Sequence, residues 1–198
     1  MHRKELRIAS LAIALLGAAF SVSTHATNIV MQTHGSWYEF GIDNIIAASG
    51  GVEWIDDIID DQGRYHGDDS PLSFSFTLTD NGVLTVVNAG FAGDEFKVNV
   101  NGIDYFSSHS QNPDFSSIGT NFDAALADSQ HYSRLTLSLV PGTYTVTGAL
   151  TAAALDANGN AYNATVGGIN VSQVPNPTAM WLFSSALAGI GIARKRRT

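Results

Sequence analysis

Alternation of apolar and polar residues is the main pattern in the middle of the chain, and it predicts β-strands. Residues 73–79 read Ser-Phe-Ser-Phe-Thr-Leu-Thr, so every second side chain is apolar, as in a half-buried strand. Alternating stretches recur at 96–100, 135–139 and 144–146, and residues 165–166 and 169–171 offer a last strand. We therefore predict a single antiparallel β-sandwich, jelly-roll or Ig-like, with one or two short helices.

Turn residues between these stretches suggest how the strands pair. Asn101-Gly102 is typical of a two-residue hairpin turn, which would pair Val100 with Ile103. Residues 140–143, Val-Pro-Gly-Thr, separate two further alternating stretches and predict a second, slightly wider connection between neighbouring strands.

A third turn follows the strand predicted at residues 73–79. A three-residue loop ending at Gly82 would pair Leu78 with Leu84 and Phe76 with Val86. All four side chains would then lie on one face. A two-residue loop would separate them, so we expect the three-residue loop.

Two short helices are predicted outside the strands. Residues 121–128, Asn-Phe-Asp-Ala-Ala-Leu-Ala-Asp, form one, with Thr120 or Asn121 as its N-cap. The other begins at Glu53, where helical spacing places the apolar residues on one face and the acids on the other. The apolar residues of that face are Trp54, Ile55, Ile58 and Ile59.

The same acidic segment has a second interpretation, as a calcium site. Calcium takes several oxygen ligands, usually from a loop. The spacing of the acids matches no standard calcium loop, and no motif requires another cofactor. The calcium candidates are Asp57, Asp60, Asp61, Asp68 and Asp69. Farther along, Asp94 is a turn residue that offers a carboxylate to a cation as the alternative.

The first 26 residues are typical of a secretory signal peptide. Basic residues near the start precede an apolar stretch at residues 8–22. Thr24 and Ala26 are small residues at the positions that signal peptidase requires, so we expect cleavage after Ala26. An uncleaved membrane anchor is the alternative, and both predict export.

The last 25 residues have three parts in order. Val174, Pro175, Asn176 and Pro177 cannot continue a helix, because proline lacks an N–H group. Residues 178–193 are uncharged and mostly apolar, and we predict a transmembrane helix there, slightly shorter than the usual span of about 20 residues. Trp181 and a basic end anchor this helix at the two membrane surfaces, with the end in the cytoplasm. The basic end consists of Arg194, Lys195, Arg196 and Arg197.

This tail resembles the PEP-CTERM sorting signal of Gram-negative bacteria. The resemblance rests on Val174, Pro175 and Pro177, on the apolar helix, and on the basic residues at 194–197. It implies processing near the motif by an exosortase, from an inner-membrane-anchored precursor to the cell surface or the medium. Exosortase systems accompany exopolysaccharide, which makes the extracellular matrix the implied partner. Asn176 departs from the family's usual Glu at that position.

Removing both signals leaves residues 27–173 as one domain and changes its charge. The whole chain has 10 basic and 18 acidic residues, but this domain keeps three basic and 17 acidic, a formal charge of −14. Such a surface repels nucleic acid, so we expect no nucleic-acid partner. The chain has no cysteine, which excludes thiol catalysis and disulfides.

The sequence holds no nucleophile elbow, zinc-protease motif or phosphate loop. Two hypotheses remain. We expect a non-enzymatic surface or matrix protein associated with polysaccharide, with Trp37, Tyr38 and Tyr65 able to stack on sugars or, alternatively, to pack in the core. The alternative is a secreted hydrolase of polysaccharide that uses carboxylates, with or without calcium. Convergence of carboxylates in a cleft would favour the hydrolase.

The dispersed histidines, His34, His66, His109 and His131, suggest no general base.

Overall fold

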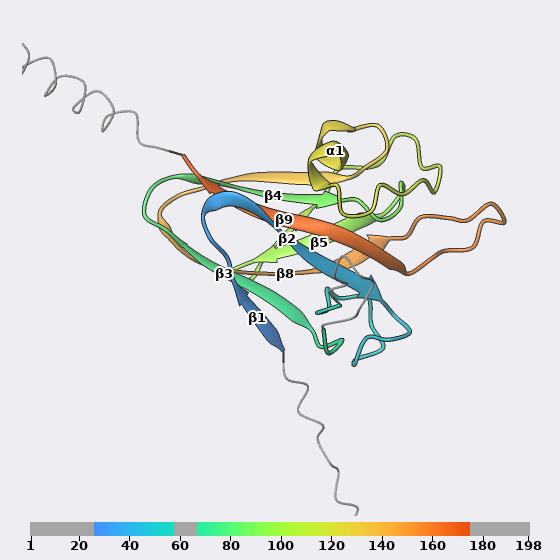
Figure 1. Cartoon of the computed structure of the whole chain (residues 1–198), viewed down its shortest axis with the longest axis horizontal. Coiled ribbons are helices and arrows are strands. Elements are labelled where there is room, and N and C mark those ends of the chain that lie inside the picture. Colours follow the sequence, from blue (N-terminus) through green and yellow to red (C-terminus); the bar gives the residue numbers. More distant parts are fainter. Residues whose placement is uncertain (1–25, 58–66, 175–198) are drawn as a thin grey trace, which may run out of the picture.

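Two β-sheets make up most of the computed structural model, which describes residues 26–57 and 67–174 (Figure 1). The described residues contain nine strands and one helix. In chain order these are β1 (Thr27–Val30), β2 (His34–Asp43), β3 (Leu72–Leu78), β4 (Gly82–Asn88), β5 (Glu95–Val100), β6 (Ile103–Phe106), α1 (Phe122–Ala127), β7 (Arg134–Leu139), β8 (Gly142–Ala152) and β9 (Ala164–Gln173).

The sheets have five and four strands. The order is β1-β3-β8-β5-β6 in the larger sheet and β2-β9-β4-β7 in the smaller. The predicted mainly β fold is therefore confirmed. The sheets are not purely antiparallel, because β1 runs parallel to β3. The finer prediction of a jelly-roll or Ig-like topology stays a prediction.

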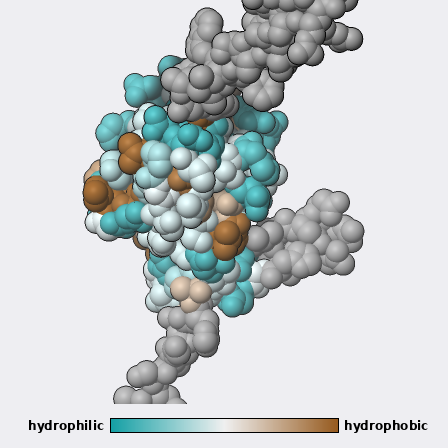
Figure 2. Space-filling view, turned by 90° about the vertical axis from the view of Figure 1, so that its left-hand side faces the viewer, coloured by the Kyte–Doolittle hydropathy of each residue, from teal (hydrophilic) through white to brown (hydrophobic). Residues whose placement is uncertain are grey.

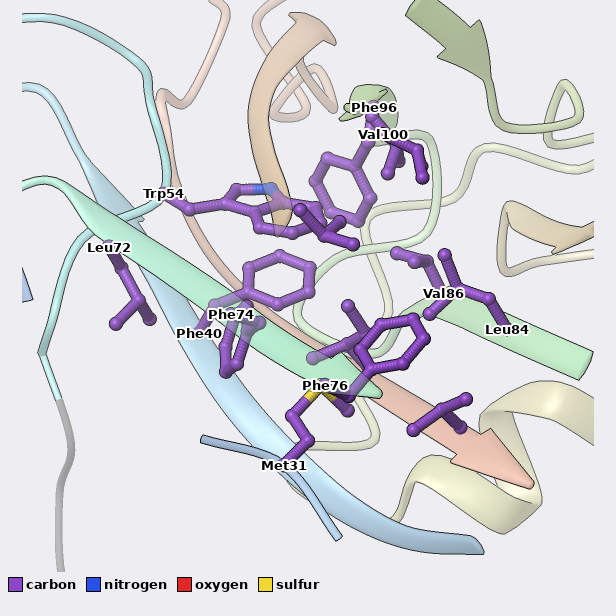
Figure 3. Close-up of a cluster of buried hydrophobic side chains, with 14 of the residues drawn as sticks. Met31, Phe40, Trp54, Leu72, Phe74, Phe76, Leu84, Val86, Phe96 and Val100 are labelled. Atoms are coloured by element: carbon purple, nitrogen blue, oxygen red, sulfur yellow. The ribbon is translucent and has the colours of Figure 1, made fainter. Parts of the chain in front are cut away.

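The core lies between the two sheets and is rich in aromatic rings (Figure 3). Phe40 from the smaller sheet stacks on Trp54, with ring centroids 3.9 Å apart and planes 18° apart. Phe74 and Phe96 from the larger sheet meet the indole edge-on, at 6.1 and 6.5 Å. Each ring of this size removes roughly 150–250 Å² of surface from water.

The Asn-Gly hairpin is confirmed. Asn101 and Gly102 adopt φ angles of 49° and 86°, the left-handed values that a two-residue hairpin turn requires. Val100 pairs with Ile103 across the turn, and Val98 pairs with Tyr105.

The pairing predicted around Gly82 is wrong. Leu78 pairs with Gly142, whereas Leu84 lies between Leu137 and Val171 in the other sheet. The turn carries the chain from one sheet to the facing sheet. Two strands whose apolar sides face each other across a core show the same alternation as two hydrogen-bonded neighbours.

The connection at residues 140–143 is wrong for the same reason. Strand β7 pairs with β4, and β8 pairs with β3 and β5, so Val140 and Pro141 also cross between sheets. The last strand is confirmed and is longer than predicted, since β9 spans ten residues.

The helix predicted from Glu53 is absent from the described part of that segment. Glu53 forms an isolated bridge with Ala149, and Ile55 bridges both Gly41 and Pro71. Extended chain at this position joins the two sheets near the core. Residues 58–66, including Ile58, Ile59 and two of the calcium candidates, lie outside the described residues.

The second predicted helix is confirmed as α1. The side chain of Asn121 accepts a hydrogen bond from the backbone N–H of Ala124 at 3.2 Å, as an N-cap does. Phe122 of α1 packs with Val87 in a second small core, on the outer face of the four-stranded sheet. The helix therefore covers part of that face (Figure 1).

Candidate functional site: an acidic pocket beside an aromatic cluster

A pocket with a volume of about 210 Å³ opens on the outer face of the four-stranded sheet. Strand β2 supplies Glu39 and Asp43 to its wall, and the irregular segment after Trp54 supplies Asp57. Strand β9 and the residues just before it supply Thr165 and Tyr162. The pocket therefore depends on chain segments far apart in the sequence.

Strand alternation places two of the carboxylates together. Phe40 and Ile42 face the core, so Glu39, Gly41 and Asp43 face outward. Gly41 makes room for the third carboxylate. A Cβ at Gly41 would lie 2.9 Å from the Cβ of Asp57 and 3.4 Å from its Oδ2. The missing side chain lets Asp57 lie against the strand between the two acids.

Burial and mutual repulsion both disfavour the charged forms of these acids. Burial raises the pKa of Glu39, and the charge of Asp57 raises it further. Burial is also the main reason that the pKa of Asp57 is raised, followed by Asp69 and Asp43. The Oδ1 of Asp57 is buried without a hydrogen-bond partner in the described structure. The pocket is therefore suited to a ligand that donates hydrogen bonds to carboxylates.

Aromatic rings form the adjoining wall. Phe91 stacks on Phe115 with centroids 4.4 Å apart, and Tyr162 meets both rings edge-on at 5.2 and 5.9 Å. Phe91 and Tyr162 line the pocket, and Tyr162 is 47% exposed. An apolar ring surface thus lies next to the carboxylates.

Asp94 lies behind this wall and is fully buried. The backbone N–H of Ala154 donates to its Oδ1 at 2.7 Å. Burial raises its pKa to about 6, although the hydrogen bond from the backbone N–H of Ala154 opposes the shift. Asp94 does not line the pocket, so its observed role is to hold the backbone at Ala154.

Only part of the predicted calcium cluster can be placed. Asp57 lines the pocket, and the charge of Asp69 raises the pKa of Asp57. The Oδ1 of Asp68 accepts a hydrogen bond from the backbone N–H of Ser70 at 3.1 Å. Among the described residues, no group of three or more side chains is arranged to hold a metal ion. Asp60 and Asp61 lie outside these residues, so calcium binding by the full cluster stays a prediction.

The aromatic residues proposed from the sequence are engaged elsewhere. Trp37 packs against Phe122 at 5.6 Å and donates to Asp123 at 2.8 Å. The hydroxyl of Tyr38 accepts from the backbone N–H of Gln32 at 2.8 Å. Both rings are therefore part of the packing, and Tyr65 lies outside the described residues.

The histidines that the structure describes lie outside the pocket lining. His109 contacts Glu95 at 2.7 Å, His131 contacts Asp128 at 2.8 Å, and His34 bonds Ser36 at 3.1 Å. Within the described residues each of these has a local surface partner. His66 lies outside them.

Glu39, Asp43, Phe91 and Tyr162 were not singled out from the sequence. The sequence does contain a signal for Glu39 and Asp43. They are four residues apart in β2, so a strand places both side chains on one face, and Gly41 between them leaves room on that face. Nothing in the sequence places Tyr162 beside them.

Most of the predicted sorting signal lies outside the described residues. Val174 and Ala26 are described and exposed. Thr24, Pro175, Asn176, Pro177, Trp181 and the basic residues at 194–197 are not, nor is the predicted transmembrane helix. Among residues 26–57 and 67–174, no helix has the length and apolar character needed to cross a membrane.

No protein-family model and no curated protein matches the chain. Among solved structures, the pre-peptidase C-terminal domain of a collagenase from Bacillus anthracis is 11% identical, with a TM-score of 0.32, covering 75% of this chain and 95% of its own. CorA, a surface-associated copper-binding protein of Methylomicrobium album, is 11% identical with a TM-score of 0.37, and the match covers 75% of this chain and 98% of CorA. A CBM35 from Cellvibrio japonicus Abf62 is 14% identical with a TM-score of 0.31, covering 71% and 99%. Likeness at these values carries no functional argument.

Proposed function

We propose that the chain is an exported, non-enzymatic surface domain that binds polysaccharide in the pocket described above. The observation that carries this proposal is the meeting of aromatic rings and carboxylates in one open pocket, where Phe91 and Tyr162 adjoin Glu39 and Asp57. Sugar rings have apolar faces that pack on aromatic rings and hydroxyl groups that donate to carboxylates. A pocket with both kinds of group can hold and orient such a ligand.

Export and sorting belong to the same proposal and rest on the two terminal segments. The domain lies between a signal peptide and a tail that resembles an exosortase substrate. Signal peptidase and an exosortase are the proposed processing partners, and the tail anchors the precursor in the inner membrane. The final location is the cell surface or the extracellular matrix.

A hydrolase of polysaccharide is the second candidate, and convergence of the carboxylates favours it. Glu39 and Asp57 line one pocket and both have raised pKa values, which is the condition for a carboxyl group to act as a general acid. Asp43 would be the second carboxylate that glycoside hydrolysis needs.

Replacing the exposed ring of the pocket should weaken polysaccharide binding. We expect Tyr162→Ala to lower affinity about tenfold, since loss of one stacking partner costs roughly 1 kcal/mol or more. The measurement is affinity electrophoresis of the secreted protein in gels that contain exopolysaccharide from the organism that makes the protein. Phe106→Ala is the matched control, because Phe106 is 62% exposed and lies on β6, away from the pocket.

The same preparations separate the two candidate functions. We expect no release of reducing sugar by the wild-type protein. Hydrolysis that disappears in Asp57→Asn would establish the hydrolase instead. Equal retardation of Tyr162→Ala and wild type would exclude this pocket as the binding site.

Replacing both prolines of the motif should block processing. We expect Pro175→Ala with Pro177→Ala to accumulate as a longer, membrane-retained precursor in the host cell, because the rigid element before the helix is lost. Immunoblots of membrane and medium fractions measure this. Normal release of the double variant would show that the motif is not recognised, whether or not the pocket binds polysaccharide.

A further inference from the structure

A second pocket lies on the outer face of the same sheet, where the described chain ends. Its volume is about 280 Å³ and most of its lining is apolar. Val83, Val140 and Val174 contribute to the lining, from the start of β4, the residue after β7 and the residue after β9. Figure 1 shows these strand ends on the left, at the opposite end of the domain from the connection between β8 and β9.

Hydrogen bonds hold the chain in place up to the last described residue. The backbone N–H of Gln173 donates to Thr33 O at 2.9 Å, and that of Val174 donates to Asn81 O at 2.7 Å. The side-chain Nε2 of Gln173 also donates to Thr79 Oγ1 at 2.8 Å. The residue that opens the sorting motif is therefore attached to the folded domain, with no free linker before it.

The valines on the two sides of the pocket remain exposed. Val140 is 66% exposed and Val174 is 47% exposed. Gly82 pairs with Leu139 on one side and with Gln173 on the other, so the two valines flank the start of β4. Two strand spacings separate them, about 10 Å. Figure 2 faces this end of the domain and shows brown residues in small separate patches on a largely white and teal surface.

We propose that Pro175, Asn176 and Pro177 occupy this pocket, so that the domain holds its own sorting motif against the sheet. Three residues of extended chain span about 10 Å, which matches the distance from Val174 to Val140. The two proline rings are apolar, and their fixed φ angles reduce the entropy lost on docking. The segment carries no charge, and its first neighbour, Val174, already lies in the lining.

Docking of the motif would make its processing depend on the folded domain. A processing enzyme would have to displace the motif from the pocket before it could bind the motif. The apparent affinity of the enzyme for the motif is then reduced in proportion to the fraction of motif that is free. This consequence rests on the proposed sorting function, whereas the docking itself does not.

The absence of cysteine from the natural chain permits a direct test by crosslinking. In the full-length precursor, purified in detergent from cells without the processing enzyme, Val140→Cys with Asn176→Cys should form a disulfide on mild oxidation. A disulfide requires Cα atoms roughly 4.4–6.8 Å apart, which docking would provide. The matched control is Thr136→Cys with Asn176→Cys, because Thr136 lies on β7 at the same outward phase as Val140 but about 13 Å before it along the chain.

Peptide mapping under non-reducing conditions then measures the yield of the disulfide-linked peptide. We expect at least fivefold more intramolecular disulfide at residue 140 than at residue 136. Equal yields at the two positions, or no disulfide at either, would overturn the proposal, because an undocked tail has no preference. A disulfide between two chains would assign the pocket to a second copy and would also overturn it.

A processing assay in the host cell addresses the consequence. Val140→Ser should be processed about threefold faster than wild type, while Val30→Ser, at a valine 69% exposed on β1, should not change. Slower processing of Val140→Ser would mean that the enzyme itself uses the pocket, which contradicts docking of the motif. Because crosslinking needs no enzyme, failure of the sorting proposal leaves the docking test intact.

Discussion

Gly148→Ala is expected to lower the free energy of unfolding by about 3 kcal/mol, because the added methyl group has no room against a packed ring. A Cβ at Gly148 would lie 2.2 Å from Cε2 of Trp54. The indole cannot retreat easily, because Phe40 stacks on it at 3.9 Å and Phe96 meets its edge. Urea unfolding followed by fluorescence measures the change.

The matched control for this variant lies in the same strand. A Cβ at Gly142 would meet Tyr144 at 3.6 Å, which is ordinary contact. Gly142→Ala should therefore leave stability unchanged or raise it by about 0.5 kcal/mol, since alanine restricts the unfolded chain. Equal losses in the two variants would show that replacing either glycine of β8 is destabilising whatever its neighbours, and that the indole is not the cause.

Asp94→Asn is expected to remove much of the pH dependence of stability. The pKa of Asp94 is raised from 3.8 to about 6, so the folded state binds more protons than the unfolded state between these values. Stability therefore falls as pH rises through this window. The expected loss from Asp94 is about 2 kcal/mol between about pH 4.5 and pH 7. Asparagine stays uncharged and keeps an oxygen that accepts from Ala154.

Unfolding in urea at the two pH values measures this loss. The raised pKa values of Glu39, Asp56 and Asp57 act in the same direction, so the informative quantity is the difference between wild type and Asp94→Asn. Asp156→Asn is the control, because that exposed carboxyl has its pKa lowered, mainly by hydrogen bonds from Asn160. An Asp94→Asn protein that loses as much stability as wild type at the higher pH would show that Asp94 is already charged in the fold.

The acidic pocket shows how far sequence analysis reaches for a site. Asp57 was identified as a candidate ligand from the density of acids around it. Its neighbours Glu39 and Tyr162 were not, because they are brought together by pairing between β2 and β9 and by the route of the chain after Trp54. Trp37 and Tyr38 were proposed as sugar contacts on residue type alone, and their environments make them packing residues.

Local chemistry was enough for several elements of this fold. The Asn101-Gly102 turn needs only left-handed φ angles, and the α1 cap needs only a side chain that accepts from a nearby N–H. Alternation also identified strands from residue 73 onward and the buried side of each, because period two alone determines which side chains share a face. These features depend on residues within a few positions of each other. Strands β1 and β2 were not predicted.

Strand partners were decided only by the tertiary structure. The stretches around Gly82 and Pro141 look like hairpins, yet each carries the chain from one sheet to the other. Alternation specifies an apolar side but not whether the next strand lies beside it or across the core. Trp54 and Ile55 were expected on a helix, and they are buried in extended chain that joins the sheets. The sequence by itself thus determined the strands that follow residue 72, the Asn101-Gly102 turn and the α1 cap. Long-range burial decided the pairing of the strands and the acidic pocket.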